Sequence, residues 1–147
     1  MTVIEPVIVL SKLDVMTKYL DNLKRFEFVT LEEYFDYFEN QLIVERLFQL
    51  IIQVALDINR YLLKNLEVEQ IETNFETFIE VGRRRIITME LAEKLAPSGS
   101  LRNRLVHMYE EIDSVKVHAA IQKALQAYPS YQRQVISYLD SLEADND

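Results

Sequence analysis

Apolar residues recur along most of the chain at spacings of three and four, the period of a helix with one buried face. Such a repeat between residues 7 and 25 predicts a first helix, with apolar positions at Leu10, Leu13, Met16 or Thr17, Leu20 and Leu23. From about residue 39 to residue 66, apolar side chains occupy most of the helical circumference. Since such a helix must be covered on several sides, we expect a central helix that also contributes to an oligomer interface. Asp57 and Arg60 within it have the spacing of a structural ion pair.

Polar residues at the ends of the repeats predict helix boundaries. Thr30 and Glu33 have the spacing of a capping box, so we expect a short helix rich in aromatic residues to start there. Residues 67–73 are polar and predict a loop. Residues 74–81 predict another short helix, with Gly82 as its stop in the left-handed conformation.

The next boundaries are predicted around the sequence Pro-Ser-Gly-Ser at 97–100. Thr88 is expected to cap a short helix over residues 89–95. The stretch 97–100 is the strongest helix breaker in the chain. We therefore expect a new helix, capped by Ser100, to begin at Leu101.

The last part of the chain predicts two more helices and a polar tail. One helix is expected from Ser114 to about Tyr128. Pro129 is expected in the first turn of the last helix, which ends near Leu142. Residues 143–147 are expected to fray.

Composition narrows the fold class to a single all-α domain. The chain has 147 residues, enough to bury one core. Its two glycines and three prolines leave little material for the tight turns of an antiparallel sheet. It has no cysteine, which excludes disulfides, thiolate catalysis and cysteine-based zinc sites. We expect residues 1–147 to form one cytoplasmic domain with neither a secretion signal nor a membrane-spanning segment.

The net charge of −8 argues against a nonspecific grip on nucleic acid, because such affinity comes largely from neutralising phosphates. The charge is uneven, however, and a locally basic patch can still hold a substrate. Locally basic positions are Arg83, Arg84, Arg85, Arg102 and Arg104. A run such as residues 83–85 is more often a solvated turn, so these three arginines and Arg104 are weak candidates for RNA binding.

The stretch from residue 100 to residue 113 carries the candidate chemistry. Arg102, His107 and Tyr109 place a fixed cation, a side chain that titrates near neutrality and a phenol within about two helical turns. This combination suits work on a phosphodiester. Residues five apart are about 140° apart around a helix, so Arg102 and His107 do not share a face, whereas Asn103 and His107 do. That geometry favours a site completed by dimerisation.

These residues also have ordinary structural interpretations. A single histidine in a helix is most often a surface residue or a capped core residue, and Tyr109 alone is more often a packing residue. His118 has no charged cluster at a matching spacing and is expected to be structural. With two histidines and no His-Glu-x-x-His arrangement, we expect no metal site.

The segment from Arg102 to Tyr109, continuing through Ile112 and Asp113, resembles the Arg-x4-His-x-Tyr motif of the HepT-type HEPN ribonuclease toxins. The resemblance extends to residues 44–47, to the long apolar helix that follows them and to the helical order throughout, so it covers most of the chain. It departs from the family pattern at Met108, where an acidic residue often stands. That departure bears on RNA contacts or antitoxin recognition and leaves the catalytic pair intact.

The resemblance implies an all-α, HEPN-type helical bundle that is homodimeric, with the two motif helices lining a shared cleft. It implies the toxin of a type VII HEPN/MNT toxin–antitoxin system, which cleaves RNA, either tRNA or mRNA, without a metal or another cofactor. Arg102 and His107 take the catalytic positions and Asn103 a supporting one. A cognate minimal nucleotidyltransferase antitoxin would use ATP to transfer AMP to Tyr109. Neither DNA nor a membrane is implied as a partner.

Two other interpretations stay open from the sequence alone. In one, the domain is a catalytically silent helical partner that presents substrates or nucleotides to a nucleotidyltransferase, although the intact Arg-x4-His spacing argues against it. In the other, the domain is a dimeric scaffold whose motif stabilises the interface. Replacing His107 would then lower the melting temperature without relieving toxicity.

Overall fold

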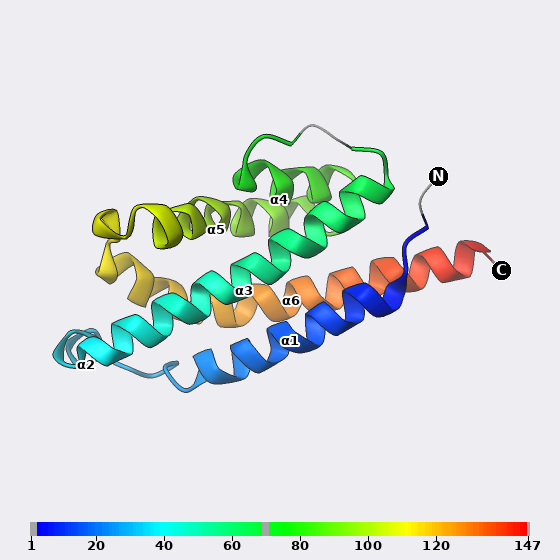
Figure 1. Cartoon of the computed structure of the whole chain (residues 1–147). Coiled ribbons are helices and arrows are strands. Elements are labelled where there is room, and N and C mark those ends of the chain that lie inside the picture. The colour runs from blue at the N-terminus through cyan, green and yellow to red at the C-terminus, as the bar shows by residue number, and fades with distance from the viewer. Residues whose placement is uncertain (1–2, 69–70, 147) are drawn as a thin grey trace.

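The computed structural model describes residues 3–68 and 71–146, and all regular structure within these ranges is helical (Figure 1). The α-helices are α1 (Pro6–Lys24), α2 (Leu31–Asp36), α3 (Phe38–Asn65), α4 (Asn74–Arg83), α5 (Met89–His107) and α6 (Ser114–Asn146). A short 3-10 helix, η1 (Tyr109–Glu111), joins α5 to α6. The predicted all-α fold is confirmed.

The long helix α3 runs through the middle of the bundle, with α1 and α6 along one side and α4 and α5 along the other (Figure 1). It contacts α1, α2, α4 and α5, which confirms the predicted central helix. Its buried residues join those of the other long helices in one hydrophobic cluster. Each fully buried leucine or isoleucine of this kind contributes about 1.5–3 kcal/mol. Toward the start of α3, Leu42 and Ile43 stay 53% and 41% exposed.

Threonine residues cap the starts of α2, α4 and α5. The hydroxyl oxygens of Thr30, Thr73 and Thr88 accept the backbone N–H three residues further on, at 3.1, 3.1 and 3.2 Å. Such a cap stabilises a helix by about 1 kcal/mol. The Thr30 hydroxyl also lies 3.0 Å from the Glu33 carboxylate. The predicted caps at Thr30 and Thr88 are confirmed.

The predicted break at Pro97–Ser100 is wrong, because α5 continues through it to His107. Pro97 is exposed, so the helical carbonyl that loses its donor there can face water. Gly99 is buried, and a Cβ atom at this position would lie 2.6 Å from the backbone carbonyl carbon of Asn74. The glycine therefore allows two helices to meet, and Ser100 lies inside the helix instead of capping one.

The other predicted breaks are also continuous helix. Gly82 lies within α4 without a positive φ, and a Cβ atom there would come 2.6 Å from the Cβ of Ala92 on α5. The left-handed conformation falls on Arg85, with a φ of 60°. Pro129 lies inside α6, which continues through residues 143–146, and the expected fraying of this tail stays a prediction. Asp147 lies outside the described residues.

Both glycines thus serve the contact between α4 and α5. Residues 69 and 70, part of the predicted loop 67–73, lie outside the described residues. Across the described part of the chain, no helix is both long and apolar enough to cross a membrane.

Candidate functional site

Arg102, Asn103, Arg104 and His107 lie in the last turns of α5, at its C-terminal end and not at a helix start as predicted. The helix ends because Met108 leaves the helical conformation, with φ and ψ of −138° and 45°. Its backbone N–H still donates to the carbonyl oxygen of Arg104 at 3.0 Å. The backbone of η1 therefore begins two residues after the motif histidine, with Met108 between the two helices.

The two predicted catalytic side chains differ in their surroundings. His107 is exposed, whereas Arg102 is half-buried. Among the described residues, nothing accepts a hydrogen bond from the buried Nε of Arg102. Along the helix the two residues are about 7.5 Å apart and about 140° apart around its axis. A single chain therefore presents them on different faces of the last turns of α5.

The side chain of Tyr109 lies outside the described part of the chain, so its predicted role as the modified residue stays a prediction. Its backbone opens η1, two residues beyond the histidine. The expectation that one helix carries the motif through Tyr109 is wrong, because the α-helical conformation ends at His107.

Asn103 belongs to a chain of polar side chains from three helices. The Asn74 Nδ2 atom at the start of α4 donates to Asn103 Oδ1 at 2.8 Å, and Arg60 of α3 donates to Asn74 Oδ1 at 2.8 Å. Because a guanidinium can only donate, it selects the Asn74 oxygen and leaves the Asn74 amide group to face Asn103. Among the residues that the structure describes, nothing accepts a hydrogen bond from the Asn103 amide nitrogen, which can therefore act as a donor.

The close approach of α4 to α5 at Gly99 explains why these three polar side chains form hydrogen bonds with one another. Gly99 and Asn103 are four residues apart and so share one face of α5. That face meets the first turn of α4, where the Asn74 backbone would lie within 2.8 Å of any added Cβ at Gly99. The same contact between the helices therefore brings the Asn74 side chain within hydrogen-bonding distance of Asn103.

Sequence reasoning missed both Asn74 and Arg60. The predicted ion pair between Asp57 and Arg60 is wrong, since Arg60 bonds to Asn74 and the Asp57 carboxylate accepts from Gln53 at 2.8 Å. The predicted helix over residues 74–81 placed Asn74 in a first turn, and Thr73 caps that turn in the structure. No periodicity connects it to a residue 29 positions later.

The structure does not bring Arg83, Arg84 and Arg85 to the motif. They lie at the turn between α4 and α5, about 20 Å from Arg102 by the rise of α5. Arg83 and Arg84 each lie 3.2 Å from the Glu80 carboxylate. All three arginines are exposed, as expected of a solvated turn. Arg104, in contrast, belongs to the same helical turns as Arg102 and His107.

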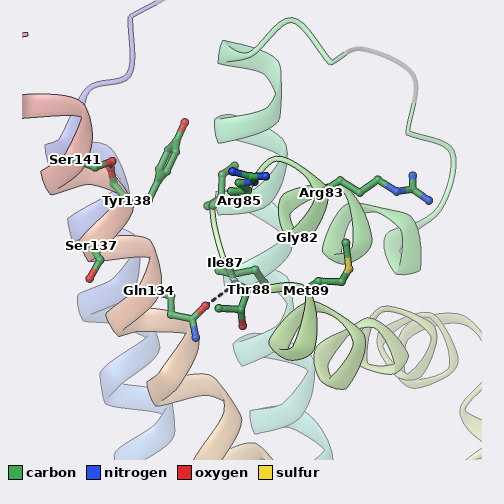
Figure 2. A pocket seen from close by; sticks show the side chains of 11 residues that line it. Gly82, Arg83, Arg85, Ile87, Thr88, Met89, Gln134, Ser137, Tyr138 and Ser141 are labelled. Atoms are coloured by element: carbon green, nitrogen blue, oxygen red, sulfur yellow. Dashed lines mark hydrogen bonds between the residues drawn. The ribbon is translucent and has the colours of Figure 1, made fainter. Parts of the chain in front are cut away.

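A hollow of about 770 Å³ lies between this arginine turn and α6 (Figure 2). Figure 2 shows Arg85 and Ile87 on one side and Gln134, Ser137 and Tyr138 on the other. The Thr88 N–H donates to Gln134 Oε1 at 2.7 Å and fastens the turn to α6. The hollow lies at the opposite end of α5 from the motif.

His118 is structural, as expected. Its Nε2 atom lies 2.6 Å from the Val29 carbonyl oxygen, so that nitrogen carries the hydrogen. The ring packs on Tyr34 at a centroid distance of 5.4 Å. Within the described ranges, no cluster of three or more histidine, cysteine, aspartate or glutamate side chains could hold a metal ion.

Comparison with known proteins places the chain in a family. The family model described as ribonuclease HepT-like matches residues 16–135. A tRNA nuclease HepT from Aphanizomenon flos-aquae is 54% identical over 147 residues, which is 100% of both chains. The protein belongs to the HepT-like ribonuclease family.

Solved structures share the fold at low sequence identity. The cytosolic protein YutE of unknown function from Bacillus subtilis superposes with a TM-score of 0.78 at 17% identity, covering 96% of this chain and 94% of its own. A tri-AMPylated HEPN toxin from Shewanella oneidensis, in complex with an MNT antitoxin, also gives 0.78, at 18% identity, with 88% and 97% covered. The HEPN-type helical fold is therefore confirmed.

Proposed function

We propose that this protein is the toxin of a HEPN/MNT toxin–antitoxin system and that it cleaves RNA in the cytoplasm, with Arg102 and His107 as catalytic residues. The observation that carries the proposal is the position of the motif at the C-terminal end of α5, where His107 is exposed and the buried Nε of Arg102 has no hydrogen-bond partner within the described ranges. The relative from Aphanizomenon flos-aquae, named a tRNA nuclease, supports RNA as the substrate class.

The residue types suit cleavage without a metal or another cofactor. The imidazole of His107 takes the proton from a ribose 2′-hydroxyl or gives one to the leaving 5′-oxygen. The 2′-oxygen bonds to phosphorus as the bond to the 5′-oxygen breaks, which yields a 2′,3′-cyclic phosphate and a 5′-hydroxyl. The Arg102 guanidinium stabilises the negative charge that develops on the phosphate oxygens.

A homodimer would complete this site. The separation of about 140° between Arg102 and His107 is bridged most simply when a second copy supplies one of the two groups. The apolar side chains exposed on α2 and the start of α3 support such an assembly, since a large exposed apolar patch marks an interaction surface. These side chains are Leu31, Phe35, Tyr37, Phe38, Leu42 and Ile43.

Silencing would act through Tyr109. A nucleotidyltransferase antitoxin would bring ATP to this tyrosine, whose oxygen attacks the α-phosphorus while pyrophosphate leaves. The added AMP is bulky and anionic, so it would repel RNA from the end of α5. The AMPylated toxin from Shewanella oneidensis supports this part of the proposal.

The test is an RNA cleavage assay with purified protein, with and without a chelator. We expect cleavage under both conditions and loss of cleavage in His107→Ala and in Arg102→Ala. Loss of wild-type activity in the chelator would contradict the metal-independent mechanism. Activity that survives in His107→Ala would contradict the assignment of the histidine.

A further inference from the structure

A groove of about 1140 Å³ runs between α5 and α6 on the side of the motif helix that Arg104 occupies. It extends along α5 from Leu91 to Arg104, which is about 20 Å of helix. Its volume exceeds the range of about 300–1,000 Å³ typical of small-molecule sites. The groove therefore has room for an extended ligand.

The lining of this groove reverses the charge balance of the chain. Overall, 24 acidic residues outnumber 16 lysines and arginines. In the groove, basic residues outnumber acidic ones, of which there are three, Glu93, Glu111 and Asp113. The basic residues are Lys94, Arg104, Lys116, Lys123 and Arg133. Such a local excess selects an anionic ligand.

These basic side chains are spread along the groove and are not gathered at one point. On α6 they extend from Lys116 to Arg133, about 25 Å of helix. Lys94 has a partner in Glu90 at 3.4 Å, but both side chains are largely exposed, so the pair is weak. Cations at intervals fit a polymer with regularly spaced negative charges.

The floor of the groove holds an unused hydrogen-bond donor. Tyr128 is 1% exposed and lines the groove, and among the described residues its hydroxyl has no hydrogen-bond partner. Burial raises the pKa of this hydroxyl, and the Ser98 side chain, which can donate a hydrogen bond to the phenol oxygen, lowers it to a smaller extent. The group therefore remains an O–H donor at neutral pH. A buried donor without an acceptor costs about 1–3 kcal/mol, which a bound oxygen atom would recover.

We propose that this groove binds the strand of RNA that leads to the motif. Phosphates contact the lysine and arginine side chains along the rim, and a ribose or phosphate oxygen accepts the hydrogen bond of Tyr128 once the side chains that cover this buried hydroxyl move aside. Arg104 connects the groove to the site, because it lies between Arg102 and His107 on the same helical turns. This inference rests on the proposed ribonuclease function and adds the path of the substrate.

The test measures binding of a fluorescent single-stranded RNA oligonucleotide to the full chain carrying His107→Ala, by anisotropy at several salt concentrations. The groove variant adds Lys116→Gln and Lys123→Gln. The matched control adds Lys18→Gln and Lys24→Gln, two exposed lysines on α1 outside the groove. We expect several-fold weaker binding only in the groove variant. Its slope of log affinity against log salt should fall by about 1.4, since each lost phosphate contact removes about 0.7 for a single strand.

A third variant, Tyr128→Phe, separates recognition from folding. Removing a buried hydroxyl that has no hydrogen-bond acceptor among the described residues should leave the melting temperature unchanged or raise it. Its RNA affinity should nevertheless fall if the hydroxyl contacts the strand. Unchanged affinity in Tyr128→Phe would overturn the role of this donor.

Several outcomes would overturn the groove as an RNA site. One is an equal effect of the groove and control lysine pairs, which would reflect net charge alone. Another is a groove variant that loses self-association or nucleotidyltransferase binding and keeps its RNA affinity, because the occupant would then be a protein. If wild-type protein cleaves RNA but the groove and control lysine variants bind RNA equally well, only the inference about the groove fails. Wild-type protein that neither binds nor cleaves RNA removes the proposed function as well.

Discussion

Asn74 and Asn103, 29 residues apart in the sequence, share a hydrogen bond of 2.8 Å that joins the first turn of α4 to the end of α5. Arg60 sets the orientation of Asn74 by donating to its oxygen. Asn103 adjoins Arg102 in the sequence, and so this contact positions the turn of α5 that carries the proposed catalytic arginine. Asn74 is therefore a positioning residue for the site.

Replacing Asn74 with alanine should lower the rate of RNA cleavage strongly and the stability of the fold only modestly. The loss of two hydrogen bonds, one to Asn103 and one from Arg60, should reduce the free energy of unfolding by about 2 kcal/mol. The control is Gln53→Ala, which also removes a hydrogen bond of 2.8 Å, to Asp57, elsewhere on α3. Thermal unfolding and cleavage rates compared in both variants check this. Equal effects on cleavage would assign Asn74 a purely structural role.

Gly99→Ala should destabilise the protein by about 1–3 kcal/mol, even though alanine favours a helix by about 1 kcal/mol over glycine. The new Cβ would lie 2.6 Å from the carbonyl carbon of Asn74, and backbone cannot rotate away as a side chain can. Chemical denaturation measures the loss. A gain in stability would show that α4 and α5 separate at little cost.

Gly82→Ala offers a matched comparison, because its new Cβ would instead meet the Cβ of Ala92 at 2.6 Å. The second change Ala92→Gly removes that atom. We expect the double variant Gly82→Ala with Ala92→Gly to recover most of the stability lost in the single variant. The same denaturation experiment tests this rescue, and additive losses would contradict it.

Relative to wild type, Glu45→Gln should be more stable at neutral pH than it is at acidic pH. Burial raises the pKa of the Glu45 carboxyl, so the folded state binds this proton more tightly than the unfolded state. Stability from this group is therefore greatest at low pH and falls as pH rises from the ordinary glutamate value through the raised folded value. Denaturation at several pH values checks this against Glu39→Gln, an exposed position on the same helix. Parallel stability curves for wild type and Glu45→Gln would refute it.

Arg102→Lys should lower the cleavage rate on the order of 10²-fold while the fold is kept. Lysine retains the charge but lacks the planar fork that can hold two phosphate oxygens. The same change at the exposed Arg25 of the α1 C-terminus serves as control. Single-turnover cleavage is the measurement, and a lysine variant as active as wild type would remove the arginine from the proposed mechanism.

Tyr109→Phe should resist silencing by a cognate nucleotidyltransferase with ATP, because no phenolic oxygen remains to accept AMP. Intact-protein mass spectrometry should detect AMP on wild type and on the control Tyr37→Phe, which removes an exposed tyrosine. AMP found on Tyr109→Phe would place the modification elsewhere.

Sequence patterns predicted the helices well where local chemistry decides. The apolar repeats placed α1 and α3 within one or two residues, and threonine caps placed the starts of α2 and α5. The predictions failed at Gly82, Pro97–Ser100 and Pro129, where residues that break isolated helices lie inside helices packed against neighbours. Tertiary packing decided those positions, and no local pattern carries that information.

The residues of the site also divide into those that a local sequence pattern predicts and those that depend on tertiary packing. The motif residues could be named from spacing, and Arg102 and His107 lie on one helix as expected. The support from Asn74 and Arg60 could not, because it depends on how closely α4 approaches α5. The same limit applies to Tyr128, whose spacing marks it only as a core residue of α6.

The two glycines of the chain limit the substitutions that members of this family can accept where α4 meets α5. They fall at opposite ends of one helix pair, so α4 is held in register against α5 at two points. A homologue that enlarges either residue must shrink the facing position or shift α4 along its axis. We expect substitutions at Gly82 and Ala92 to covary among relatives, while position 99 tolerates no larger side chain as long as the asparagine pair is kept.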